Sequence, residues 1–181
     1  MIVRVLLLSS LMLGNVRAEI IDRIVVSVGN QVVTASEVRR EIQMAAFLNG
    51  AEPDFGADSR RKAAERLIEQ KLIRKEMEVG RYPGPAAAET EPLLQQVREQ
   101  RFKSNEEYLG ALAKYGISEP DLKAQLLWQL TVLRFVEFRF RVPGDTASQA
   151  QVNQEIDKEM DAWLKEARAR TRIEYRPESS Q

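Results

Sequence analysis

The sequence predicts a mainly α fold (α+β) of about six helices with a small antiparallel sheet. Apolar residues recur at helical spacing through most of the chain between residues 34 and 170. Stretches rich in β-branched residues lie near both ends of that region, at 21–34 and 171–175. The chain has no cysteine, so we expect helix packing, and not disulfides, to hold the fold.

The first 18 residues predict a secretory signal peptide. Arg4 supplies a basic start, residues 5–14 are apolar and uncharged, and Val16-Arg17-Ala18 resembles a cleavage site. The apolar run of about ten residues is too short for a bilayer, which needs roughly 20. We therefore expect cleavage after Ala18, a periplasmic location and no stable membrane insertion. The alternative for this segment is a buried N-terminal helix.

Residues 21–34 predict a β-hairpin. Alternating Val and Ile side chains precede Gly29-Asn30, a two-residue turn that tolerates positive φ, and Val32-Val33 resumes the strand. A single hairpin is marginally stable in water. We therefore expect a third strand from residues 171–175 to pair with it and close the chain on itself.

Two long helices follow the hairpin. Thr34-Ala35-Ser36-Glu37 fits a capping box and predicts a helix that ends near Leu48. Residues 50–58 are rich in Gly, Pro and Asp and predict a loop. The second helix is expected from about Ser59 to Val79, with Asp58 as its N-cap.

Three further helices are predicted after a Pro-Gly break. The first covers about 91–102. The second begins at a capping box over 104–107 and ends at Gly116, a C-cap residue. The third and longest begins after Ser118 and runs to about Arg141.

The last helix is predicted over 148–170, followed by the strand at 171–175 and a disordered tail at 177–181. We expect this helix to pack against the first and the longest helices. The expected core at that contact consists of five residues: Leu126, Leu130, Leu133, Trp163 and Leu164.

Four stretches resemble the N-terminal domain of the SurA family of periplasmic chaperones. They are IDRIVVSVGNQVVTASEV, AAERLIEQKLIRKEMEVGR, SNEEYLGALAKYGISEPDL and, near the end, AWLKEARARTRIEY. Their order and joint occurrence carry the resemblance, which extends over almost all of residues 19–176. It implies one chaperone domain that includes the returning C-terminal helix and strand.

The chain departs from that family in one respect. SurA-like proteins carry parvulin isomerase modules between the two parts, whereas here only residues 142–149 connect them. Parvulin sites use histidine with cysteine or aspartate, and this chain has no histidine and no cysteine. We therefore expect no prolyl isomerase activity.

Other chemistries are disfavoured by composition. Nucleophile–histidine and zinc sites lack their ligands, and no calcium-loop motif occurs. The full chain has 27 basic and 27 acidic residues, and removal of Arg4 and Arg17 with the signal peptide leaves 25 basic and 27 acidic residues in 19–181. That balance argues against nucleic acid, which requires a concentrated basic footprint. We expect a non-enzyme with no cofactor and no metal.

The remaining interpretation is a chaperone that works without ATP. It would bind unfolded, apolar or aromatic segments of envelope proteins, and the resemblance implies outer-membrane proteins among them. A surplus of flexible apolar side chains suits such binding. The predicted contacts are Met44, Phe47, Leu48, Phe55, Phe102 and Tyr108, for each of which ordinary core packing is an alternative. Two alternative functions are an assembly adaptor with one fixed envelope partner and a degenerate isomerase relative.

Overall fold

The computed structural model describes residues 22–140 and 149–177. These residues form six α-helices, one short 3-10 helix and a three-stranded sheet, which confirms the predicted fold class. The elements in chain order are β1 (Ile24–Val28), β2 (Gln31–Thr34), α1 (Ala35–Asn49), α2 (Ala57–Gly80), η1 (Ala87–Glu89), α3 (Thr90–Arg101), α4 (Asn105–Tyr115), α5 (Glu119–Arg139), α6 (Gln149–Arg170) and β3 (Ile173–Tyr175). The expected signal peptide and most of the expected tail lie outside the described residues.

The sheet has the strand order β2-β1-β3, and both pairings are antiparallel. Gly29 turns the hairpin with φ of 61°, which glycine adopts without strain. Two backbone hydrogen bonds of 2.8 Å flank the β1–β3 pairing, from Gly29 N to Arg172 O and from Arg176 N to Val25 O. The C-terminal strand therefore returns to the hairpin, as the sequence predicts.

Local signals place the starts of most helices. The capping box at α1 forms between Thr34 and Glu37, and the one at α5 forms between Ser118 and Asp121. The expectation for α2 is wrong in one detail, because Gly56 is the N-cap and Asp58 lies in the first turn. An acidic side chain in the first turn favours the helix through its dipole, so the same residue still supports the helix start.

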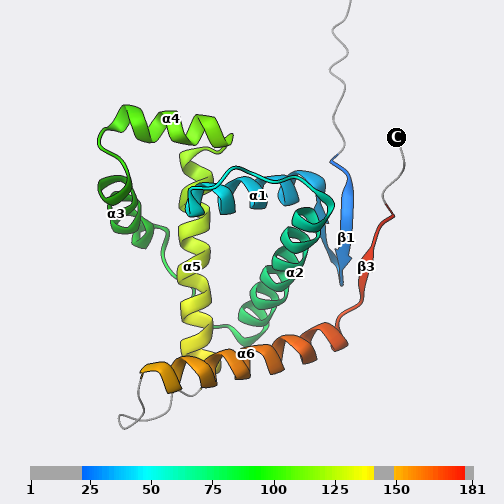
Figure 1. The fold of residues 1–181 in the computed structure, drawn as a ribbon. Coiled ribbons are helices and arrows are strands. Elements are labelled where there is room, and N and C mark those ends of the chain that lie inside the picture. Colours follow the sequence, from blue (N-terminus) through cyan, green and yellow to red (C-terminus); the bar gives the residue numbers. More distant parts are fainter. Residues whose placement is uncertain (1–21, 141–148, 178–181) are drawn as a thin grey trace, which may run out of the picture.

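The helices lie on both sides of α5 (Figure 1). The α2 helix lies on one side and the α3–α4 pair on the other, while α6 crosses below α2 and α5 and leads up to β3. This arrangement divides the apolar interior into two clusters. The first joins the sheet, the N-terminal half of α1 through Val38 and Ile42, α2, the part of α5 from Trp128 onward, and α6. The second joins α1, α3, α4 and the N-terminal half of α5.

The first cluster contains the closure of the chain. Trp163 of α6 is 5% exposed and packs against Phe135 of α5, which is fully buried. The partners differ in part from those expected, because Trp163 lies against Phe135, beyond the expected stretch Leu126 to Leu133 of α5, and α6 also contacts α2. The C-terminal helix therefore covers the lower end of the domain.

The expected core around the longest helix needs one correction. Leu126 and Trp163 are buried, and Leu130 and Leu164 are half-buried, but Leu133 is 59% exposed. Phe135 faces α6. Successive residues of an α-helix are rotated by about 100° around its axis, so Leu133, two residues earlier, points to nearly the opposite side of α5. No described element covers the Leu133 side of α5 at that level, and the leucine meets solvent.

Candidate functional site

A groove runs between the N-terminal ends of α1 and α2 and the sheet. It consists of two adjoining hollows of about 600 Å³ and about 200 Å³. Four residues line both hollows and join them into one groove: Arg23, Ala35, Val38 and Arg60. The larger hollow extends along α1 toward Phe55, and the smaller one reaches Tyr175 at the end of β3. We call the two hollows together the α1–α2 groove.

The floor of the α1–α2 groove is apolar. Val38 and Ile42 lie one helical turn apart on α1 and are 3% and 6% exposed. Ala64 of α2 contributes to the floor of the smaller hollow, together with the half-buried Val25 of β1. Val38, Ile42 and Ala64 are core residues that close the bottom of the hollows, so the apolar surface that a side chain from another molecule can contact comes from Val25, Phe55 and Tyr175 along the walls.

The rim of the α1–α2 groove is cationic. Four exposed arginines line it from four elements or their flanks: Arg23, Arg39, Arg61 and Arg176. Within residues 22–140 and 149–177, none of these four guanidinium groups forms a hydrogen bond or an ion pair. A fifth arginine, Arg60, donates through Nη1 to the carbonyl of Phe55 at 2.8 Å. The four arginines Arg23, Arg39, Arg61 and Arg176 therefore present positive charges at the rim that no carboxylate of the described residues pairs with.

Two carboxylates near this rim, Asp22 and Asp54, already have local partners. Asp22 accepts hydrogen bonds from the hydroxyl and backbone N of Ser36, and these hydrogen bonds lower its pKa. Asp54 accepts from Ser59 Oγ at 2.5 Å and from Gly56 N at 2.8 Å, which likewise lower its pKa. Each carboxylate is thus kept ionised by its own hydrogen bonds and is not paired with a rim arginine.

Glu65 lies below the end of β3 and has two partners of its own. Its carboxylate pairs with Arg168 Nη1 at 2.8 Å and accepts a hydrogen bond from the Tyr175 hydroxyl. Burial and that hydrogen bond raise the pKa of Tyr175 to about 12. This cluster anchors β3 to α2 and α6, and so it fixes one wall of the smaller hollow.

The predicted client contacts fall into two groups. Phe55 is 42% exposed and lines the α1–α2 groove. The other five belong to the second apolar cluster, where Leu48 and Phe102 are half-buried and three side chains are buried, namely Met44, Phe47 and Tyr108. These three side chains fill the core, which leaves no exposed surface for a client to contact.

The packing around Phe47 explains that burial. Its ring stacks on Phe102 at 6.1 Å between centroids and meets Tyr115 edge-on at 5.6 Å. Arg101 lies over the Phe47 ring and donates to its carbonyl at 2.7 Å. The aromatic residues near the chain breaks therefore pack against one another. This is the ordinary core packing named above as the alternative to client contact.

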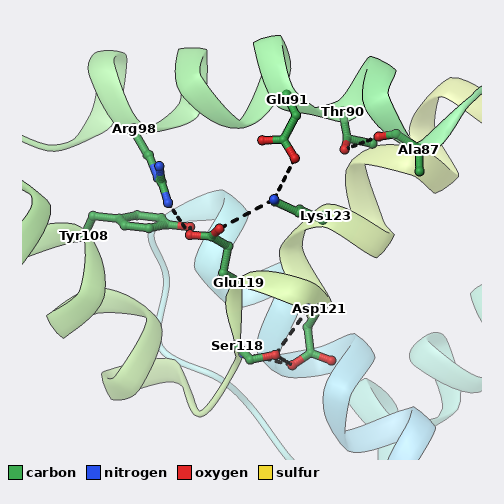
Figure 2. A network of polar contacts seen from close by, with 9 residues as sticks. All are labelled: Ala87, Thr90, Glu91, Arg98, Tyr108, Ser118, Glu119, Asp121 and Lys123. Atoms are coloured by element: carbon green, nitrogen blue, oxygen red, sulfur yellow. Dashed lines mark hydrogen bonds and ion pairs between the residues drawn. The ribbon is translucent and has the colours of Figure 1, made fainter.

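A polar network joins α3, α4 and α5 on the outer side of the second cluster (Figure 2). The Tyr108 hydroxyl donates to Glu119 at 3.2 Å, and the same carboxylate pairs with Arg98. Lys123 bridges Glu119 at 3.7 Å and Glu91 at 2.6 Å. Within the described residues the Arg98 Nε is buried without an acceptor, but the contacts that are drawn tie the three helices together.

The rim arginines are functional candidates that sequence reasoning missed. The pairs Arg39-Arg40 and Arg60-Arg61 are visible in the sequence, but surface charge pairs of this kind occur on many solvated helices. Only the tertiary fold shows that Arg39 of the first pair and both members of the second pair line the same groove as Arg23 and Arg176. No local pattern in the sequence carries that information.

No protein-family model and no curated protein matches the chain. Among the described helices, none is both long enough and apolar enough to cross a bilayer. The described part of the chain also has no cluster of three or more acidic, His or Cys side chains placed to hold a metal ion.

Proposed function

We propose that this protein is an exported, periplasmic chaperone that binds extended segments of unfolded envelope or outer-membrane proteins without ATP and without bond chemistry. The observation that carries the proposal is the α1–α2 groove, which the described residues leave open and which the exposed rings of Phe55 and Tyr175 line. The resemblance of four sequence stretches to the SurA N-terminal domain supports the same function. The periplasmic location rests on the signal-peptide pattern of residues 1–18.

The size and shape of the α1–α2 groove suit a short run of an extended chain. The larger hollow, at about 600 Å³, falls within the range of about 300–1,000 Å³ that ligand sites occupy. The exposed ring of Phe55 stands at one end, where it can stack on or slide along an aromatic side chain of a client. A recessed floor with one exposed aromatic at its edge favours side-chain capture over binding of a flat folded surface.

Suppression of aggregation tests this proposal. The purified protein, at a few-fold molar excess and without nucleotide, should keep an unfolded outer-membrane β-barrel protein from aggregating, as followed by light scattering. Phe55→Ser should weaken that suppression because it removes the exposed ring at the α1–α2 groove. Leu133→Ser is the matched control, since it removes an exposed apolar side chain from α5, outside this groove.

Absence of suppression together with absence of peptide binding would contradict the chaperone function. A pull-down separates it from the adaptor alternative, because a chaperone retains many unfolded proteins whereas an adaptor retains one folded partner. An isomerase assay on a proline peptide tests the third interpretation, and we expect the uncatalysed rate. Catalysis there would contradict the assignment as a non-enzyme.

A further inference from the structure

We propose that the α1–α2 groove selects client segments in which apolar residues are flanked by Asp or Glu. The inference rests on the proposed function and deepens it by naming the class of segment that is bound. The hollows would take the apolar side chains, and the rim arginines would pair with carboxylates on either side of them. The occupant is therefore an extended, acidic and apolar peptide.

Charge complementarity carries the argument. The chain as a whole has 27 basic and 27 acidic residues, so a local gathering of positive charge is not a consequence of composition. Four rim arginines have no partner within the described residues, whereas two nearby carboxylates, Asp22 and Asp54, are held by Ser36 and Ser59, and a third, Asp58 in the first turn of α2, offsets only part of the positive charge. The local field over the groove is positive, and the partner that it attracts is negative.

The α2 helix adds to that field at the same place. Its N-terminus lies at the α1–α2 groove, with Ala57, Arg60 and Arg61 lining the smaller hollow. Gly56, the N-cap, has no side chain to accept hydrogen bonds from the first turn. The positive end of the helix dipole therefore lies on the same side as the rim arginines, and Asp58 of the first turn offsets part of it.

The form of the groove favours a peptide over a membrane surface. Val38 and Ile42 are almost completely shielded at the bottom of the hollow, and the arginines stand above them. A flat bilayer would meet the arginines without reaching the floor, but an extended chain can place alternate side chains into the hollow. Arginine also binds carboxylates through two parallel hydrogen bonds, which adds geometric selectivity to the charge.

The test compares three fluorescein-labelled peptides with one identical apolar, aromatic-containing centre. The centre is flanked on both sides by paired Glu, by paired Gln or by paired Lys, and affinity is measured by fluorescence anisotropy at low salt. Exposed ion pairs are individually weak, so we expect the Glu peptide to bind about three- to tenfold more tightly than the Gln peptide and the Lys peptide to bind most weakly. The difference should shrink as salt is raised, because salt screens exposed charges.

Variants assign the selectivity to the rim. Arg39→Gln combined with Arg61→Gln should lower the affinity for the Glu peptide more than the affinity for the Gln peptide, so the preference shrinks, and the remaining rim arginines Arg23 and Arg176 retain part of it. The matched control, Lys75→Gln with Lys165→Gln, removes two positive charges from exposed positions that do not line the groove and should preserve the preference. Far-UV circular dichroism and melting temperature check that both double variants are folded.

The outcomes separate this inference from the function on which it rests. If all three peptides bind equally, selection by charge is wrong and the chaperone function stands. If none binds, the proposed function fails as well. Binding to vesicles of anionic phosphatidylglycerol that is lost in the arginine variant, without any preference for the Glu peptide, would overturn the peptide proposal in favour of a lipid surface.

Discussion

The indole of Trp163 lies against the ring of Phe135, with centroids 4.8 Å apart and planes inclined by 57°. This contact joins the returning helix α6 to the far end of α5, across the connection that lies outside the described residues. Phe140 meets Phe135 edge-on at 5.7 Å and completes the aromatic group. The lower end of the first cluster is closed by these three rings.

Replacing Trp163 by Ala should destabilise the protein strongly. Removing a buried aromatic side chain costs about 3–5 kcal/mol because the space that it filled is only partly reclaimed. That loss is a large share of the roughly 5–15 kcal/mol that holds a domain folded. Urea denaturation followed by circular dichroism measures it, and a wild-type midpoint would show that α6 does not close the core.

Trp163→Phe is the matched control for that variant. The indole N–H is buried and has no acceptor among the described residues, and an unpaired buried donor is costly. Phenylalanine keeps the contact with Phe135 and removes the unpaired group. We expect a loss well below that of the Ala variant in the same denaturation experiment.

Substitution of Ala for Gly110, inside α4, and for Gly116, at its C-terminus, should change the stability of the protein in opposite directions. Gly116 ends α4 with φ of 66°, and a Cβ there would approach Gln43 Nε2 to 2.7 Å. Gly116→Ala should cost at least about 1–2 kcal/mol for the left-handed backbone. Gly110 lies inside α4 with nothing within 4 Å of an added Cβ, so Gly110→Ala should gain about 0.5–1 kcal/mol.

Thermal melts of the two glycine variants, recorded under one set of conditions, check this pair. Equal shifts in the same direction would contradict the assigned backbone conformations. Since both substitutions add the same methyl group, the sign of the difference depends on the local backbone and not on the chemistry of alanine.

The hydroxyl of Tyr175 should make stability depend on alkaline pH. Burial and the hydrogen bond to Glu65 raise its pKa from 10.0 to about 12 in the folded protein. A raised pKa means that the folded state holds the proton more tightly, so this stabilisation is complete below about pH 10 and is lost between about pH 10 and about pH 12. Denaturation of the wild type and of Tyr175→Phe across that window checks it, because other titrating groups are common to both.

We expect the stability advantage of the wild type over Tyr175→Phe to fall as the pH rises through this window. An advantage that stays constant from pH 10 to pH 12, or that grows, would contradict the position of Tyr175 against Glu65. The loss of β3 anchoring would also open one wall of the smaller hollow.

Much of the fold is encoded locally and could be predicted from the sequence. Hydrogen bonds between residues at most four positions apart determine several helix ends. They form the capping boxes at Thr34 and Ser118 and the C-cap at Gly116. The pairing of β3 with β1 could also be predicted from the sequence, since a hairpin of two strands is only marginally stable unless a third strand pairs with it. The predicted N-cap of α2, Asp58, lies two residues after the observed N-cap, Gly56, because both residue types suit a helix start.

What could not be predicted depends on which faces meet. Leu133 fits the apolar stripe of α5, yet α6 packs on the opposite side, where Phe135 lies. Phe47 and Tyr108 lie near chain breaks, and only the tertiary fold shows that the breaks bring their rings together. The rim arginines come from segments as distant as Arg23 and Arg176, so their gathering becomes visible only in the folded chain.

Hydrogen exchange with a bound peptide tests the central claim most directly. The protein is saturated with the Glu-flanked apolar peptide, and amide exchange is read by mass spectrometry. We predict slower exchange in the first turns of α1 and α2 and in β3, the elements that line the α1–α2 groove. Saturated binding that leaves these segments unchanged and slows exchange around Leu133 of α5 would contradict the account.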